Sequence, residues 1–106
     1  MTDAIVVLST TASRAEADRI AEALVERRLA GCVQIVGPIA SVYRWQEKVE
    51  QSEEWLCVIK SRQSAFAQLK TAIAELHSYE TPEIIALDVS GGSADYLRWL
   101  QASVGP

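Results

Sequence analysis

The sequence predicts an α+β fold, with helices on one face of an antiparallel sheet, in a single domain that spans residues 1–106. Four apolar segments have the length and composition of β-strands, and two segments between them repeat apolar residues at helical spacing. These segments follow one another in the order β-α-β-β-α-β, and a short helical segment comes after the last strand. Two helices that cover a sheet in this order form the ferredoxin-like arrangement.

The first strand is predicted at residues 4–9, a β-branched run typical of a buried strand. Ser13 and Glu16 have the spacing of a capping box, in which both side chains bond to free amides at a helix start. Apolar residues then recur at helical spacing at Ala17, Ile20, Ala21 and Leu24. Gly31 is predicted as the left-handed residue that ends this helix.

A long hairpin is predicted after the first helix. Residues 32–36 form a strand that a Gly-Pro pair interrupts, and residues 39–50 alternate between apolar and polar side chains, as in a strand with one buried face. Residues 54–60 form the partner strand, which is apolar on both faces. The polar residues 51–53 are predicted as the turn between the two strands.

The last third of the chain predicts a helix, a strand and a short final helix. Residues 64–76 carry an apolar stripe typical of a helix. Pro82 keeps the residue before it out of the helical region, so the run that begins at His77 is expected to lead into a strand at residues 83–90. Two glycines then turn the chain, and Ser93 is positioned to cap the final helix.

Composition and charge restrict the possible functions. Ten basic and fourteen acidic side chains give a net charge of −4, which disfavours binding to nucleic acid and to anionic lipid surfaces. No apolar run approaches the roughly 20 residues of a membrane helix, and the run at residues 4–8 is too short for a signal-peptide core. A cytoplasmic location is therefore expected. In that reducing compartment Cys32 and Cys57 are expected to be small buried hydrophobic residues rather than a disulfide.

The large aromatic side chains exceed what two short helices can cover. The hairpin carries Tyr43, Trp45 and Trp55, and the final helix adds Trp99. Exposed apolar surface of that size usually marks an association site, and an extended two-stranded ribbon is itself a template for pairing. We therefore expect these four residues to form an interface between copies of the chain with closed symmetry. The aromatic content alone leaves dimer and trimer open.

The only histidine opens a polar run at residues 77–84, where an imidazole, a phenol and the carboxylates of Glu80 and Glu83 surround a proline. One interpretation is a small ligand site, because loops on rigid scaffolds often carry function. The other is a structural corner, in which the two carboxylates pair with Arg44 or Lys48 of the hairpin. The residues leave both interpretations open.

Five motifs stand in order along nearly the whole chain. They are LAGCVQI at residues 29–35, SVYRWQ at 41–46, EWLCVIK at 54–60, HSYETPEIIA at 77–86 and YLRW at 96–99. Together they resemble the motifs of the CutA, or divalent-cation tolerance, family. The resemblance implies one CutA-like domain in a tight homotrimer, with hairpins that pair across subunits. The architecture is also similar to that of the PII signalling proteins, which suggests small-ligand sites at subunit clefts.

The chain departs from the pattern of that family at two positions. Ser78 stands where the family usually has proline, and Gly31 stands where it commonly has alanine. Neither departure is expected to change the fold. The serine is expected to loosen the loop that holds His77.

The resemblance also implies a link to divalent cations, and some members of the family are reported to bind copper. Imidazole suits copper(II) and thiolate suits copper(I) or zinc, so the expected metal ligands are His77, Cys32 and Glu80. No cofactor is expected other than Cu²⁺ or another divalent cation. The residues expected around a small ligand are Tyr79, Glu80, Glu83, Arg44 and Lys60.

No enzyme activity is expected. Cys32 and His77 have the residue types of a nucleophilic pair, but Cys32 lies in an apolar strand with no basic neighbour to activate it. The first functional hypothesis is a trimeric cytoplasmic protein, linked to divalent-cation tolerance, that binds copper or another small ligand at a cleft between subunits. The alternative is a structural or signalling trimer that acts through protein partners and has no specific metal site.

Overall fold

The computed structural model describes residues 2–105; Met1 and Pro106, the two ends of the predicted domain, lie outside the described residues. The strands are β1 (Ala4–Thr11), β2 (Cys32–Trp45), β3 (Lys48–Arg62) and β4 (Ile85–Asp88), and the helices are α1 (Arg14–Glu26), α2 (Phe66–Leu76) and α3 (Ala94–Ser103), with a 3₁₀ turn at Gln63–Ala65. This order confirms the predicted α+β fold of four strands and three helices.

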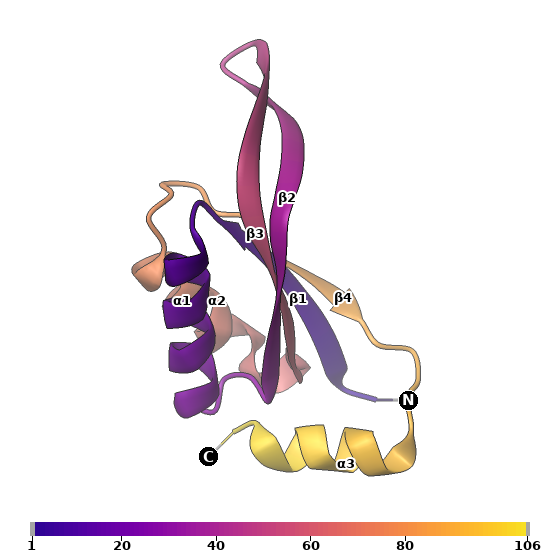
Figure 1. Cartoon of the computed structure of the whole chain (residues 1–106). Helices are drawn as coiled ribbons and strands as arrows, with labels where there is room; N and C mark the ends of the chain where they lie inside the picture. Colours follow the sequence, from indigo (N-terminus) through magenta and orange to yellow (C-terminus); the bar gives the residue numbers. More distant parts are fainter. Residues whose placement is uncertain (1, 106) are drawn as a thin grey trace.

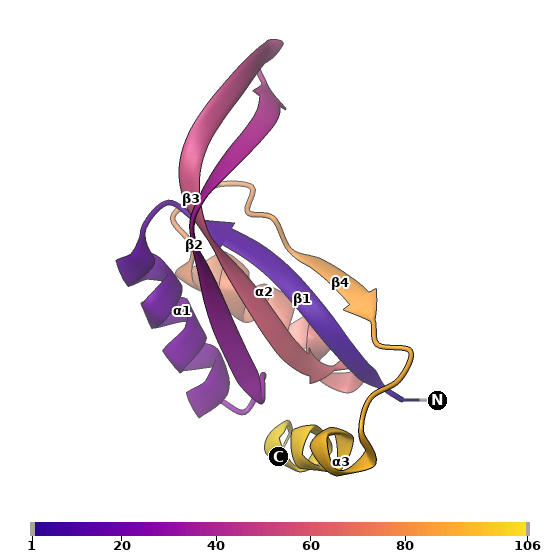
Figure 2. The ribbon, with the colours of Figure 1, turned by 45° about the vertical axis from the view of Figure 1, so that its right-hand side comes forward.

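The four strands form one antiparallel sheet in the order β2-β3-β1-β4. Helices α1 and α2 cover one face of this sheet, and α3 lies across the end at which the N-terminus begins (Figure 1). The hairpin of β2 and β3 extends well beyond the helices, as the rotated view in Figure 2 also shows. Its outer half therefore has no helix against it. No helix among residues 2–105 is long and apolar enough to cross a bilayer.

The hydrophobic core lies between the sheet and the pair α1 and α2. Its largest fully buried members are Ile5, Val7, Cys57 and Ile59 from the strands and Ile20, Leu24, Leu69 and Ile73 from the helices. A second, smaller cluster under α3 consists of Ala4, Ala65, Leu100 and Val104. The main core packs β1 and β3 against α1 and α2, and the smaller cluster packs them against α3 at one end of the sheet. Neither cluster includes a residue of the hairpin tip.

The hairpin turn lies at Gln46 and Glu47, so the prediction of a turn at residues 51–53 is wrong. Both turn residues have positive φ (50° and 68°), and Trp45 pairs directly with Lys48. A two-residue turn of this kind matches the twist of the strands it joins. Neither residue is the glycine or asparagine that usually favours it, which is why the sequence pattern placed the turn elsewhere. Residues 51–53 lie instead within β3.

Gly31 does not end α1 in the left-handed conformation, so that prediction is also wrong. The left-handed residue after α1 is Arg28, with φ of 59°. Gly31 instead lies close to α3, because a Cβ atom at this position would be 2.7 Å from Cδ1 of Leu100. Its small size therefore permits the close approach of α3 to the start of β2.

All four strands differ in their bounds from the prediction: β1 extends to Thr11, and β3 begins at Lys48. The Gly37-Pro38 pair does not end the strand at residue 36, because β2 continues beyond a register shift between Val36 and Ile39. A Cβ atom on Gly37 would lie 2.5 Å from the Trp55 ring, so the glycine lets this indole pack over the strand. Strand β4 is shorter than predicted and pairs only with β1, which leaves it as one outer edge of the sheet.

Candidate functional site

His77 anchors the loop between α2 and β4, residues 77–84, which we call the His77 loop. Its side chain is fully buried, and Nε2 lies 2.7 Å from the carbonyl oxygen of Thr10 on β1. The Tyr79 amide donates to Nδ1 at 3.0 Å. Because a carbonyl only accepts and an amide only donates, Nε2 is the donor to Thr10 and Nδ1 is the acceptor from Tyr79. Both ring nitrogens are occupied within the chain.

Glu16 of α1 holds the next residue of the loop. Ser13 caps α1 as predicted, since its Oγ accepts from the Glu16 amide at 3.1 Å. The Glu16 carboxylate accepts from the Ser78 amide at 2.6 Å and from the Ser78 hydroxyl at 3.1 Å. Burial raises the pKa of Glu16, but the hydrogen bonds from the Ser78 amide and hydroxyl outweigh it and hold this pKa below its usual value. The carboxylate is therefore ionised at neutral pH.

Ser78 was expected to loosen the loop, and in the structure it bonds the loop to Glu16 of α1. One of its two bonds to Glu16 comes from the backbone amide, a donor that proline lacks. The other comes from a hydroxyl group. At this position the serine ties the loop to α1 through polar contacts that a proline could not make.

Tyr79 links the loop to the hairpin. Its hydroxyl donates to Oε2 of Glu54 on β3 at 2.7 Å, and its ring centroid lies 4.8 Å from that of His77. Burial, together with the hydrogen bond to Glu54, raises the pKa of Tyr79 well above its usual value. Tyr79 is thus a neutral donor at physiological pH. Through these contacts α1, β1 and β3 all hold the loop in place.

A groove of about 780 Å³ lies between the His77 loop and the hairpin, and we call it the hairpin groove. One wall is made by loop residues 79–83, and the other by hairpin residues Ser41, Val42, Tyr43, Trp45 and Glu54, with Thr10 at the base. Its volume lies in the range typical of small-molecule sites. The fold therefore combines a rigid loop wall with a wall from the protruding hairpin.

The hairpin groove is acidic and has no positive side chain in its lining. Its charged residues are Glu54, Glu80 and Glu83, and no lysine, arginine or histidine lines it. Within residues 2–105 none of the three carboxylates forms an ion pair, so the pairing of Glu80 and Glu83 with Arg44 or Lys48 is not found. Glu54 is only 8% exposed, and the Tyr79 hydroxyl is the one hydrogen-bond partner of its carboxylate in that part of the chain.

Three of the five predicted ligand residues line the groove and two do not. Tyr79, Glu80 and Glu83 lie in the loop wall. Arg44 lies between Tyr43 and Trp45 on β2 but is not among the residues that line the groove. Lys60 lies far along β3, where its Nζ donates to the Gln34 side chain.

Sequence reasoning missed Glu54 and Glu16. Glu54 pairs with Ile39, which places it near Ser41 and Tyr43, but only a turn at residues 46–47 gives this register. The alternation of side chains in the hairpin would have identified Glu54, had the turn been placed correctly. Glu16 was predicted only as part of a helix cap, and nothing local indicates that its carboxylate reaches Ser78.

The predicted metal ligands do not converge within one chain. Cys32 pairs with Lys60, whereas Thr10, which holds His77, pairs with Leu56. The four-residue offset along β3 corresponds to about 13 Å. Across residues 2–105 no group of three His, Cys, Asp or Glu side chains lies close enough to hold a metal ion.

The cysteines are not placed for catalysis. The separation that divides Cys32 from His77 also prevents a nucleophile–base pair between them. Cys57 is buried in the core, and burial, with nearby Asp18 and Glu16, raises its pKa to about 11. It is therefore a thiol at neutral pH. Both cysteines are free, and Cys32 is only partly buried.

Three of the four predicted interface aromatics are exposed in the single chain. Tyr43 is 42% and Trp45 57% exposed on the hairpin, and Trp99 is 47% exposed on α3, where it packs against Tyr96. Trp55 is partly buried against the core of its own chain. The hairpin also exposes Val42 and Val49, so its apolar surface continues to the tip.

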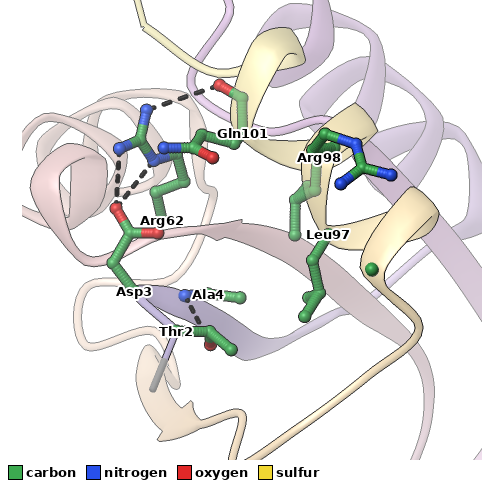
Figure 3. A pocket seen from close by; sticks show the side chains of 9 residues that line it. Thr2, Asp3, Ala4, Arg62, Leu97, Arg98 and Gln101 are labelled. Atoms are coloured by element: carbon green, nitrogen blue, oxygen red, sulfur yellow. Dashed lines mark hydrogen bonds and ion pairs between the residues drawn. The ribbon is translucent and has the colours of Figure 1, made fainter.

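A second cavity of about 360 Å³ lies between α3 and the start of β1, and we call it the α3 cavity (Figure 3). The Arg62 guanidinium contacts the Asp3 carboxylate at 2.7 and 2.8 Å and the Gln101 carbonyl oxygen at 3.4 Å. Arg98, at the other side of the cavity, pairs with Asp95 on its own helix. The charged side chains that line this cavity are thus all paired, and Arg62 joins the end of β3 to α3 and to the residue that precedes β1.

Comparison with known proteins relates the whole fold to one family. The model of a family described as CutA1 divalent ion tolerance protein matches residues 5–103. A divalent-cation tolerance protein CutA from Thermus thermophilus is 46% identical over 100 residues, which cover 94% of this chain and 97% of that protein. One from Pectobacterium atrosepticum is 45% identical over 102 residues, covering 96% and 93%.

Comparison with solved structures relates the fold to the same family. The divalent cation tolerance protein from Thermus thermophilus superposes with a TM-score of 0.95 at 45% identity and covers 96% of this chain and 99% of that chain. A CutA from Xylella fastidiosa superposes with a TM-score of 0.95 at 35% identity, covering 98% and 100%. The protein from Archaeoglobus fulgidus is described as periplasmic and an Arabidopsis thaliana relative as chloroplastic.

Proposed function

Since the chain belongs to the CutA1 divalent ion tolerance family, we propose that it is a homotrimeric cytoplasmic binding protein of divalent-cation tolerance. In this proposal the hairpin groove forms one wall of a cleft between subunits and takes copper or another small ligand. The observation that carries it is the groove itself, a rigid loop wall facing a hairpin that protrudes from its own subunit. The protein binds its ligand without catalysing a reaction.

Two unlike free edges of the sheet support a cyclic assembly. Strands β2 and β4 are the outer strands, and each presents unpaired backbone groups. The β2 edge exposes Val36 and Val42, whereas β4 exposes Ile85 and Leu87. Contact between two different edges is head-to-tail, and such contacts close into a ring when the rotation permits. A ring of three would cover both edges of every subunit.

A copper ion does not fit the residues of one chain. Both nitrogens of His77 are engaged, and the β3 residue that pairs with Cys32 lies about 13 Å along the strand from the one that pairs with Thr10, which holds His77. Copper sites need several converging donors. Metal binding in this proposal therefore requires donors from more than one subunit, and the exposed carboxylates of Glu80 and Glu83 are candidates for them.

Light scattering after gel filtration tests the assembly. We expect a mass about three times the 11.6 kDa of one chain. Trp45→Ala should lower this mass toward that of a monomer, because it removes the most exposed indole of the hairpin. Val25→Ala, which shortens an exposed apolar side chain on α1, should leave the mass unchanged. A monomeric wild type, or a Trp45→Ala variant with unchanged mass, would refute the proposed assembly.

Calorimetric titration of Cu²⁺ and Zn²⁺ into metal-free protein tests the metal. A shared site predicts saturation at one defined ratio to the trimer and loss of binding in Glu80→Gln. Weak heat that is equal in wild type, Glu80→Gln and the His77→Ala control would exclude a specific metal site.

The second candidate function is a trimer that acts through protein partners. It is favoured by the loop bonds, which use His77 and Ser78 entirely within the subunit, and by the exposed pair of Tyr96 and Trp99, whose ring centroids lie 5.4 Å apart. In that case the His77 loop serves only the contact between subunits, and protein partners bind the exposed surface of α3. Retention of a partner that depends on Trp99 and is unaffected by Glu80→Gln would support this function over the first.

A further inference from the structure

We propose that residues 93–105 form a C-terminal strap that opens as one unit, separately from the main core, and that Arg28 is its latch. The strap consists of α3, its cap Ser93 and the two residues Val104 and Gly105 that follow the helix. It lies across the end of the sheet, below α1 and α2 in Figure 1. Neither the ligand of the hairpin groove nor the number of subunits enters this proposal.

The apolar contact between the strap and the rest of the fold is small. Leu100 and Val104 are the two buried residues of the strap, and Leu97 is partly buried beside them. They pack against Ala4 and Ala65 in the smaller cluster, whereas no strap residue belongs to the main core. Alanine side chains bury little apolar surface, and the stabilisation is roughly proportional to that surface. The apolar contact alone therefore holds the strap more weakly than the main core holds α1 and α2.

The end of α3 receives its cap from another part of the chain. The last four carbonyl groups of an α-helix have no partner within the helix, and a positive charge near them is stabilising. The last turn of α3 carries no basic residue. Arg28, in the turn after α1, supplies the charge: its guanidinium donates to the carbonyl oxygens of Ala102 and Gly105 at 2.7 and 2.6 Å. Such charge-assisted bonds are roughly twice as strong as bonds between neutral groups.

Arg28 also holds the strap through its backbone, because the Gly105 amide donates to the Arg28 carbonyl oxygen at 2.9 Å. Elsewhere among residues 2–105, outside the strap, only Arg62 donates from its side chain to a strap carbonyl. That contact, to Gln101 at 3.4 Å, is long for a hydrogen bond (Figure 3). The polar attachment of the strap is therefore concentrated at one residue, which is the reason to assign Arg28 as the latch.

The other end of the strap is attached loosely. A Cβ atom on Gly91 would meet no atom within 4 Å, so the link from β4 to α3 runs through open space. The Ser93 cap accepts from the Tyr96 amide at 3.4 Å, a bond that lies within the strap itself. Loss of the Arg28 contacts would therefore let the strap move as one unit about this link.

Opening of the strap changes the surface at this end of the sheet. Leu100 covers the start of β2, since a Cβ atom on Gly31 would lie 2.7 Å from its Cδ1. Release would uncover Gly31, Ala4 and Ala65 and would bring the side chains of Leu100 and Val104 into solvent. The latch thus controls whether this end of the sheet is closed or presents an apolar surface.

Hydrogen exchange of the backbone amides in the full-length assembled protein, followed by mass spectrometry, tests the proposal. We expect the amides of α3 to exchange at least about tenfold faster than those of α2. Arg28 has φ of 59°, and Arg28→Asn removes the guanidinium but keeps a residue that tolerates this conformation. The variant should accelerate exchange in α3 by a further factor of about ten and leave α2 unchanged. Arg27→Asn should leave α3 unchanged, because Arg27 is exposed and forms no ion pair among residues 2–105.

Faster exchange that is confined to α3 and caused by Arg28→Asn alone supports the proposal, whether the protein is a trimer or a monomer. Equal acceleration of α2 and α3 in Arg28→Asn would overturn it, because the strap would then open only with the whole fold. Unchanged exchange of α3 in that variant, for example because a neighbouring subunit holds the helix, also overturns it, as does equal acceleration by Arg27→Asn. Circular dichroism reports folding; if Arg28→Asn does not fold, Arg28→Lys, which keeps the charge but lacks the planar fork, takes its place.

Discussion

The hairpin groove and the α3 cavity contain similar numbers of charged side chains but differ in how those charges are compensated. In the α3 cavity Arg62 pairs with Asp3 and Arg98 with Asp95. In the groove Glu54, Glu80 and Glu83 have no counter-ion among residues 2–105. Charges that are paired inside the chain connect its elements. Unpaired charges in a groove are available to a group from outside the chain.

The α3 cavity illustrates the first case. Arg62 connects the end of β3 to Asp3, which precedes β1, and to the Gln101 carbonyl oxygen of α3. Arg28, in the turn after α1, donates to the carbonyl oxygens of Ala102 and Gly105 at 2.7 and 2.6 Å. Two arginines thus dock the C-terminal segment onto the rest of the fold. The groove has no comparable cross-links apart from those that hold the His77 loop.

The largest effect is expected from His77→Ala, which removes the anchor of the groove's loop wall. The change deletes the bond to the Thr10 carbonyl, leaves the Tyr79 amide without its acceptor and empties a fully buried site. Together these losses should lower the free energy of unfolding by about 3 kcal/mol in urea denaturation. Gln68→Ala, on the exposed face of α2, should change it by less than about 0.5 kcal/mol. Equal effects of the two variants would show that the loop is not anchored in this way.

Glu16→Gln should lower stability by about 1–2 kcal/mol at pH 7, because an amide accepts the bonds from Ser78 less well than a carboxylate does. The pKa of Glu16 is lower in the folded than in the unfolded chain. Its contribution is therefore fully present above the unfolded pKa of about 4.3 and is lost as the pH falls through the folded pKa. Urea denaturation of both proteins between pH 7 and pH 2.5 should show the difference shrinking. A difference that stays constant over this range would contradict the assignment.

Glu54→Gln should raise the stability of the protein, whereas Glu16→Gln should lower it. Without ligand, it removes a buried charge and retains an acceptor for the Tyr79 hydroxyl, so stability should rise by up to about 1 kcal/mol. The wild type and the variant should be compared by thermal unfolding at equal protein concentration, because assembly affects the midpoint. Glu75→Gln should leave the midpoint unchanged. A clear loss of stability in Glu54→Gln would mean that the carboxylate already has its partner.

The smallest effect is expected from Arg62→Met in the α3 cavity. The side chains of Arg62 and Asp3 are 24% and 44% exposed, so solvent and salt screen the pair. We expect a loss below about 1 kcal/mol at low salt that shrinks further in 1 M NaCl. Arg14→Met, which removes the more exposed ion pair with Asp18 on α1, should cost less still. A salt-independent loss of several kcal/mol would show that Arg62 stabilises the fold through packing.

The element order and the faces of the elements could be predicted from the sequence because side-chain periodicity reports burial directly. The turn could not, since Gln46 and Glu47 adopt positive φ without the glycine or asparagine that usually signals it. That single error shifted the expected strand and concealed the position of Glu54. Strand register depends on the turn, so a local mistake became a mistake in the site.

The contacts of the His77 loop could not be predicted from the sequence for a different reason. His77 was expected as a metal ligand because of its residue type, yet both of its nitrogens bond to the backbone. The Glu16 carboxylate, expected to complete a helix cap, reaches a residue 62 positions away. Contacts of this range arise only when α1 and α2 are packed on the sheet, and no local pattern encodes them.

The most direct test of the proposed assembly is a crystal structure of the protein as it exists in solution. We predict a closed ring of three subunits, in which the outer strands β2 and β4 of neighbouring subunits meet and the hairpin groove opens into a cleft between them. A monomer, or a trimer in which a neighbouring subunit fills the hairpin groove, would contradict the proposal.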